Sequence, residues 1–77
     1  MKIFKYVITQ ENEPILFSKN LLHNKISINA ISAGFLILFI DIKRKKYRVK
    51  CFGESTTLNI KSNMSLDKKI IESFLNS

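Results

Sequence analysis

The side chains that could serve as a nucleophile and a base in this sequence are few and widely separated. Cys51 is the single cysteine and His23 the single histidine of the chain. A Cys–His pair performs nucleophilic chemistry only where the thiol is exposed and activated by the imidazole. The residues around Cys51 alternate so that it falls on the apolar face of a strand, where cysteine acts as a small hydrophobic residue. We therefore predict no catalytic residues and expect the protein not to be an enzyme.

Residues 53–57, Gly-Glu-Ser-Thr-Thr, partly match the G-x-S-x-G turn that presents a catalytic serine. Thr57 stands where that motif needs its second glycine, and 77 residues are too few for the α/β-hydrolase sheet. Gly53 and Ser55 are better interpreted as parts of a polar turn between strands. A zinc site needs three or four closely spaced ligands, which one Cys and one His do not supply. We predict neither a metal nor a cofactor.

The strongest charge feature is a basic run that contains six Lys and Arg residues within eight positions. A basic β-ribbon can enter a nucleic-acid groove, and nearby aromatic side chains can stack on unpaired bases. The alternative interpretation is a solvated hairpin tip whose charges discourage edge-to-edge aggregation. The candidate nucleic-acid-binding residues are Lys43, Arg44, Lys45, Lys46, Arg48 and Lys50.

The two segments that flank this run are predicted to form a long central hairpin. Residues 35–42 are almost entirely apolar, and residues 47–52 alternate. We expect Ile42 to lie opposite Tyr47, which places Asp41 directly across from Arg48 in a favourable cross-strand pair. One face of the hairpin is then wholly apolar and should face the core. Its residues are Leu36, Leu38, Ile40, Ile42, Tyr47, Val49 and Cys51.

The other face of the hairpin carries the candidate protein interface. Small monomers seldom expose a large contiguous apolar patch, so an uncovered patch there would mark a contact surface. The competing possibility is that the N-terminal hairpin or residues 18–33 cover this face. The candidate interface residues are Phe35, Ile37, Phe39 and Phe52.

The segments before the central hairpin have a less uniform pattern. Residues 3–9 and 14–17 alternate and predict a first hairpin in which Ile8 faces Ile15 and Tyr6 faces Phe17. Apolar residues at helical spacing predict a short helix over residues 25–33, ended by Gly34. Residues 26–29 also alternate as a strand would, and this second interpretation stays open.

The segments after the central hairpin predict one more strand and one more helix. Residues 57–61 alternate, so we expect a fifth strand there. Residues 66–75 carry a broad apolar stripe, with Ser65 as the N-cap, and should form a helix across the core face of the sheet. The predicted class is α+β, with the order ββαβββα and a mostly antiparallel five-stranded sheet.

The length and composition fit one domain over residues 1–77. Hydrophobic residues make up 45% of the chain and charged residues 25%. The net charge of +7 suits an anionic partner, although 11 Lys against 2 Arg is also what compositional bias alone produces. A single cysteine, no signal-peptide pattern and no apolar run long enough to cross a bilayer lead us to expect a cytoplasmic protein without membrane contact.

Our leading hypothesis from the sequence is a non-enzymatic binding domain that acts through protein contacts, including self-association as a homodimer. The alternative is a nucleic-acid-binding module that uses the basic hairpin tip.

Overall fold

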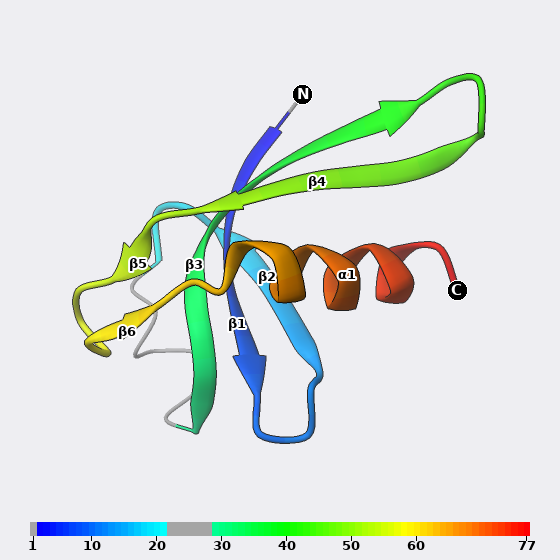
Figure 1. Ribbon diagram of the computed structural model, residues 1–77. Helices are drawn as coiled ribbons and strands as arrows, with labels where there is room; N and C mark the ends of the chain where they lie inside the picture. The colour runs from blue at the N-terminus through cyan, green and yellow to red at the C-terminus, as the bar shows by residue number, and fades with distance from the viewer. Residues whose placement is uncertain (1, 22–28) are drawn as a thin grey trace.

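A computed structural model describes residues 2–21 and 29–77 of the chain. The elements in chain order are β1 (Lys2–Thr9), β2 (Pro14–Ser18), β3 (Ala30–Asp41), β4 (Lys46–Phe52), β5 (Glu54–Ser55), β6 (Ile60–Lys61) and α1 (Met64–Leu75). Four strands form an antiparallel sheet in the order β2-β1-β3-β4, and β5 pairs with β6 in a small second sheet (Figure 1). The predicted α+β class, with a C-terminal helix packed on the sheet, is confirmed.

The main core lies between α1 and one face of the four-stranded sheet, which we call the helix face. Alternation along β1 places Tyr6 and Ile8 on this face, and both are fully buried. They pack with Ile71 of α1 and with the helix-face residues of β3 and β4. The opposite face, which we call the second face, has its own small cluster around Val7. That cluster consists of Val7, Phe17 and Ala33, with Leu58 and Ile60 packed against it.

The central hairpin has the predicted faces but a different register. Leu38 lies opposite Val49, and Arg48 lies opposite Phe39 instead of Asp41. The turn has four residues, 42–45, and Lys45 adopts a φ of 54°. A shift of two residues leaves the paired side chains on their original faces. Leu36, Leu38, Val49 and Cys51 face the core as predicted. The prediction is wrong for Ile40, Ile42 and Tyr47, which are exposed because they lie at the projecting end of the hairpin. The predicted direct pair of Asp41 and Arg48 is wrong, because the two side chains meet only diagonally, at 4.0 Å.

The first hairpin is shifted by one residue from the predicted register, and this shift does change a face. Tyr6 lies opposite Leu16, and Lys5 lies opposite Phe17. The backbone N–H of Thr9 donates a hydrogen bond to the carbonyl oxygen of Glu13, at 3.0 Å, and closes a loop of three residues, 10–12, in which Asn12 adopts a φ of 61°. Turns of this type end with one residue in the left-handed region, which Asn tolerates. Phe17 therefore packs on the second face and not beside Tyr6.

The predicted helix over residues 25–33 is wrong in its last part, and residues 25–28 lie outside the described residues. Ala30–Asp41 is one continuous strand that pairs with β1. Gly34 is therefore a mid-strand residue and not a helix terminator. A Cβ atom there would lie 2.6 Å from the carbonyl oxygen of Phe52 and 3.1 Å from the Cβ of Ser62. Glycine permits the chain after β4 to cross closely over β3.

The C-terminal elements also differ in detail from the prediction. Of the expected strand at residues 57–61, only Ile60–Lys61 is a strand, because residues 56–59 form a turn in which Asn59 has a φ of 55°. Helix α1 begins two residues earlier than expected, at Met64. Its N-cap is Asn63, whose side chain accepts a hydrogen bond from the backbone N–H of Leu66.

A buried carboxylate joins α1 to the sheet. Asp67 is fully buried, and its carboxylate accepts hydrogen bonds from the Tyr6 hydroxyl (2.5 Å) and the Ser32 hydroxyl (2.7 Å). The backbone N–H of Asn63 donates a third bond, at 2.9 Å. Buried polar groups are tolerated when each has a partner, and these groups satisfy one another. The network fixes the position of the first turn of α1 over β1 and β3.

Glu72 of α1 and Asn76, the residue that follows the helix, close part of the outer edge of β4. The Glu72 carboxylate accepts a hydrogen bond from the backbone N–H of Val49, at 2.8 Å. The Asn76 side chain accepts from the N–H of Tyr47 and donates to its carbonyl oxygen, at 2.8 and 2.9 Å. Unpaired edge groups are a template for pairing with other chains, so the helix protects this edge.

Candidate nucleic-acid interface

The most conspicuous feature outside the core is the projecting end of the central hairpin. β1 pairs with β3 as far as Lys2, which lies opposite Leu38. Beyond this point residues 39–48 continue as a two-stranded arm (Figure 1). Residues 41–50 hold six Lys and Arg against one Asp, so this short segment accounts for five of the seven net positive charges. The charge is therefore concentrated and not spread evenly over the surface.

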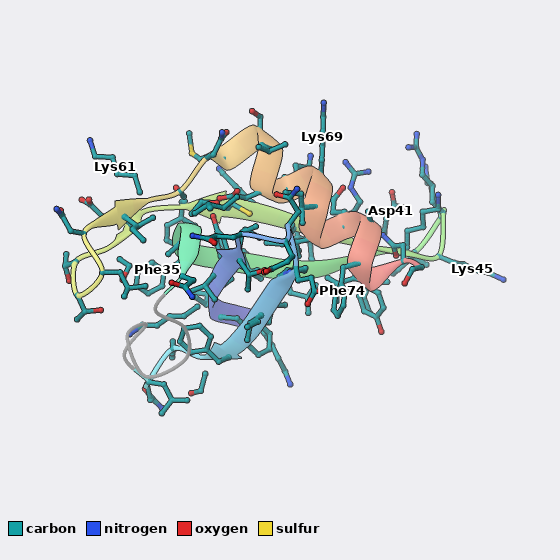
Figure 2. All side chains as sticks on the ribbon, turned by 90° about the horizontal axis from the view of Figure 1, so that it is seen from below. Phe35, Asp41, Lys45, Lys61, Lys69 and Phe74 are labelled. Atoms are coloured by element: carbon teal, nitrogen blue, oxygen red, sulfur yellow. The ribbon has the colours of Figure 1, made fainter. Side chains whose placement is uncertain are left out.

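The basic residues of this segment differ in how they are held. Arg48 is partly buried, and its Nε lies 3.3 Å from the Glu72 carboxylate, so its charge is largely balanced. Arg44 is exposed and lies 4.0 Å from Asp41, across the turn. The lysines of the arm are exposed to solvent, and Figure 2 shows Lys45 at the far end of the molecule, opposite Lys61. The arm lysines Lys43, Lys45 and Lys46 are thus better placed than the arginines to meet an anionic partner.

A shallow pocket at the base of the arm is lined by an aromatic residue and two lysines. Its volume is about 490 Å³, and Phe39 of β3, Lys50 of β4 and Lys68 of α1 contribute to its lining. The Phe39 side chain is 43% exposed and Lys50 is exposed. A flat ring next to cationic groups can stack on a nucleobase while the cations contact phosphates.

Lys68 was not among the residues predicted from the sequence. It lies 18 residues beyond Lys50 in the chain, and only the packing of α1 along β4 brings the two together. The sequence did contain a pattern that could have pointed to Lys68, because Lys68 precedes the buried Ile71 by three residues. Residues with this spacing share one side of a helix, so Lys68 had to flank the side that packs on the sheet.

The four residues predicted as a protein interface share the second face, but the surface they form is not continuously apolar. Phe35 and Phe52 are half-buried and stack on each other, with ring centroids 5.7 Å apart and planes inclined by 21°. The Lys5 ammonium lies 5.8 Å from the centroid of the Phe35 ring. Ile37 is half-buried opposite Lys50. Cationic side chains therefore interrupt the apolar patch, and its role as an interface stays a prediction.

The residues considered for catalysis do not form a site in the described part of the chain. Cys51 is 3% exposed, and burial raises the pKa of its thiol to about 11. Ser55 is buried, and its hydroxyl accepts a hydrogen bond from the backbone N–H of Leu58. His23 lies outside the described residues. Over residues 2–21 and 29–77, no group of three His, Cys, Asp or Glu side chains gathers where it could hold a metal ion.

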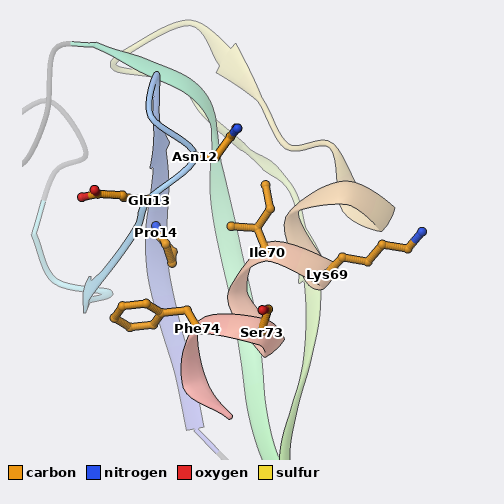
Figure 3. A pocket seen from close by; sticks show the side chains of 7 residues that line it. All are labelled: Asn12, Glu13, Pro14, Lys69, Ile70, Ser73 and Phe74. Carbon is orange, nitrogen blue, oxygen red and sulfur yellow. The ribbon is translucent and has the colours of Figure 1, made fainter. Parts of the chain in front are cut away.

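A second groove lies on the other side of α1, next to the turn between β1 and β2. Its volume is about 430 Å³, and Pro14 faces Ile70 and Phe74 of the helix there (Figure 3). The charged residues of its lining are one lysine, Lys69, and one glutamate, Glu13. This balance of charge gives no preference for an anionic partner, so the groove is a weaker candidate than the pocket at Phe39.

No protein-family model, curated protein or solved structure matches this chain. In the part of the chain that the structure describes, no helix has the length and apolar character needed to cross a membrane.

Proposed function

We propose that this protein is a non-enzymatic module that binds single-stranded nucleic acid through the pocket at Phe39 and the arm lysines. The observation that carries the proposal is the exposed Phe39 ring in a pocket that Lys50 and Lys68 also line. A base stacked on an aromatic ring contributes about 1–3 kcal/mol whatever its identity, because every base has a π-face. Such a site accepts unpaired bases and has little sequence preference.

The charge distribution favours a polyanion over a second copy of the chain on this face. In a two-fold symmetric interface each residue near the axis meets itself or its neighbours. A homodimer formed through the second face would bring Lys5 and Lys50 of both copies together, and like charges across an interface are unfavourable. A phosphate backbone reverses the sign of this interaction, and displaced counterions add to the affinity.

The first test measures fluorescence anisotropy of labelled oligothymidine and of a duplex of equal length. We expect tighter binding of the single strand and a loss of about tenfold or more in affinity for Phe39→Ala. Ile3→Ala is the matched control, since Ile3 is similarly exposed, at 45%. Equal loss in both variants, or duplex preferred over single strand, contradicts the stacking role of Phe39.

The second test compares two triple variants that remove the same charge. In one, Lys43, Lys45 and Lys46 become Gln; in the other, Lys19, Lys61 and Lys69, which are exposed and lie off the arm, become Gln. If the arm lysines contact phosphates, the slope of log K against log salt should become shallower by about 2 in the arm variant, at about 0.7 for each lost contact. Equal effects of the two variants would show that only total charge matters.

A second candidate function is binding of an acidic protein surface through the same face. The observation that favours it is the exposure of Ile3 and Phe39 beside lysines, because mixed apolar and charged surfaces also occur at protein interfaces. If the protein binds an acidic protein surface and not nucleic acid, we expect no binding of the labelled oligonucleotides at low salt. Capture of acidic partners by the wild type and not by Phe39→Ala would then support it.

A nucleic-acid-binding role agrees with the expected location in the cytoplasm. The single cysteine, Cys51, is a buried free thiol and cannot form an intramolecular disulfide, which suits a reducing compartment. Microscopy of the tagged chain tests this location, and a periplasmic or extracellular signal contradicts it.

A further inference from the structure

The apolar side of the central hairpin becomes less covered toward its tip. On the helix face of β4, Val49 is 1% exposed and packs in the main core, whereas Tyr47 is 43% exposed. Ile40, which pairs with Tyr47, is 61% exposed, and Ile42, the first residue of the turn, is 84% exposed. Among the large apolar side chains of residues 2–21 and 29–77, Ile42 is therefore the most exposed, and it lies at the end of the arm.

Basic side chains accompany these apolar residues. Lys45 and Lys46 line the same hollow as Ile40, Ile42 and Tyr47, and its volume is about 350 Å³. The other two residues of the turn, at positions 43 and 44, are an exposed lysine and an exposed arginine. The tip therefore presents three large apolar side chains together with four positive charges.

The one acidic residue of the arm is compensated within the turn. Asp41 is the only Asp or Glu among residues 38–50. Its carboxylate accepts a hydrogen bond from the backbone N–H of Arg44, at 3.3 Å, and it lies 4.0 Å from the side chains of Arg44 and Arg48. The free charges of the tip are thus all positive.

We propose that the tip of the arm binds the surface of a bilayer that contains anionic phospholipids. Ile40, Ile42 and Tyr47 enter the boundary between headgroups and acyl chains, where surface-bound amphipathic segments bury their apolar side. Tyrosine is favoured at this depth, because its ring is apolar and its hydroxyl is polar. Lys45 and Lys46 lay their apolar stems along the surface and keep their ammonium groups among the lipid phosphates.

The same residues disfavour other occupants of this surface. A second copy of the chain would bring Lys45 and Lys46 of both copies together, and like charges across a contact are unfavourable. A nucleobase stacks on a flat ring, which the aliphatic side chains of Ile40 and Ile42 do not supply. An anionic bilayer matches both properties of the tip, because its phosphates attract the lysines and its acyl chains cover the isoleucines.

The position of the tip allows it to meet a flat surface. The arm projects beyond the four-stranded part of the sheet, and Lys45 lies at one end of the molecule (Figures 1 and 2). Contact of this kind needs no segment that crosses the bilayer, and we therefore revise the expectation of no membrane contact, which rested on the length of apolar runs. This inference goes beyond the proposed function, because the isoleucines of the tip have no part in nucleic-acid binding.

The main test is flotation of the protein with vesicles, without nucleic acid. Vesicles that contain phosphatidylserine are compared with vesicles of phosphatidylcholine alone, and we expect binding to be at least tenfold tighter to the first. The double variant Ile40→Ser, Ile42→Ser should lose about tenfold or more in affinity for them, because lipid no longer buries two aliphatic side chains. The matched control is Ile3→Ser, Ile15→Ser, whose isoleucines are 45% and 37% exposed off the arm; it should bind as the wild type does.

A second pair of variants tests the lysines of the hollow. Lys45→Gln, Lys46→Gln should weaken binding by about fivefold for each lysine removed. Its control, Lys61→Gln, Lys69→Gln, removes the same charge from exposed positions off the arm and should weaken binding less. Far-UV circular dichroism verifies that each variant is folded.

A further readout reports how deeply the tip enters the bilayer. The chain has no Trp, so Ile42→Trp introduces a single reporter. We expect its emission to shift to shorter wavelength on phosphatidylserine vesicles and to be quenched by brominated acyl chains. Ile3→Trp is the control and should show neither effect. This readout keeps both apolar positions filled and does not depend on how the serine variants fold.

Three outcomes overturn the proposal. One is a wild-type chain that does not bind phosphatidylserine vesicles at low salt. Another is vesicle binding that Ile40→Ser, Ile42→Ser leaves unchanged, with no shift in Ile42→Trp, which reduces the contact to adsorption by charge alone. The third is capture of an acidic protein, and not of vesicles, that the double isoleucine variant abolishes. The nucleic-acid proposal stands apart from these results, because Ile40→Ser, Ile42→Ser should still bind oligothymidine and Phe39→Ala should still bind vesicles.

Discussion

Replacement of Asp67 by Ala tests how far the buried polar network determines stability. The substitution removes the acceptor of the Tyr6 and Ser32 hydroxyls, whose residues are 0% and 5% exposed. A buried donor without a partner costs about 1–3 kcal/mol, so two of them cost about 2–6 kcal/mol. A chain of 77 residues has a total stability of about 4–12 kcal/mol. We therefore expect Asp67→Ala to lose about half of its free energy of unfolding.

The assay is urea denaturation followed by circular dichroism, with a double-mutant cycle. Tyr6→Phe alone leaves the carboxylate with one bond fewer, whereas in the Asp67→Ala background it removes a hydroxyl that already lacks its partner. Tyr6→Phe should therefore cost less in that background, with a coupling energy of about 1–3 kcal/mol. Asp67→Asn keeps one acceptor oxygen and should fall between wild type and Asp67→Ala. Strict additivity of the two substitutions would refute the account of the network.

Three further predictions concern packing, the sheet edge and pH. Gly34→Ala places a methyl group 2.6 Å from the Phe52 carbonyl oxygen and should cost about 1–3 kcal/mol in urea melts; a neutral effect contradicts the close crossing. Glu72→Ala leaves the Val49 N–H without its acceptor, so we expect lower stability and faster aggregation by light scattering, and no change contradicts edge protection. Because the pKa of Cys51 is higher in the folded protein than in the unfolded chain, there is a pH range in which the folded thiol is protonated and the unfolded thiol is ionised. Unfolding free energy should therefore fall by about 1.4 kcal/mol per unit between about pH 8.5 and pH 11, and less steeply in Cys51→Val; equal slopes contradict this.

Alternation in the sequence predicts the faces of the sheet better than it predicts the register. The period of two depends only on extended backbone, so Tyr6 and Val7 fall on opposite faces whatever the turn does. Register depends on turn geometry, and here it is set by left-handed residues at Asn12 and Lys45. Lysine is an unusual residue for that conformation, so the turn of the central hairpin has no recognisable sequence signal.

Contacts between distant segments explain what local patterns could not predict. Ala30 and Ala33 have helical spacing, yet pairing with β1 places both in a strand. Gly34 resembles a helix terminator until residues 52 and 62 are known to cross it. The candidate nucleic-acid interface also depends on contacts between distant segments. The basic run and Phe39 are visible in the sequence, whereas the contribution of Lys68 depends on where α1 docks.

The bond between Tyr6 and Asp67 also has a consequence for the growing chain during synthesis. All four strands of the main sheet are complete once Phe52 has been made, about 15 residues before the acceptor for Tyr6. Ribosomes add about 5–20 residues per second, so this delay lasts on the order of a second, whereas a hairpin forms in about 1–10 μs. The helix face therefore has no cover from its own chain until residues 64–75 of α1 have been made.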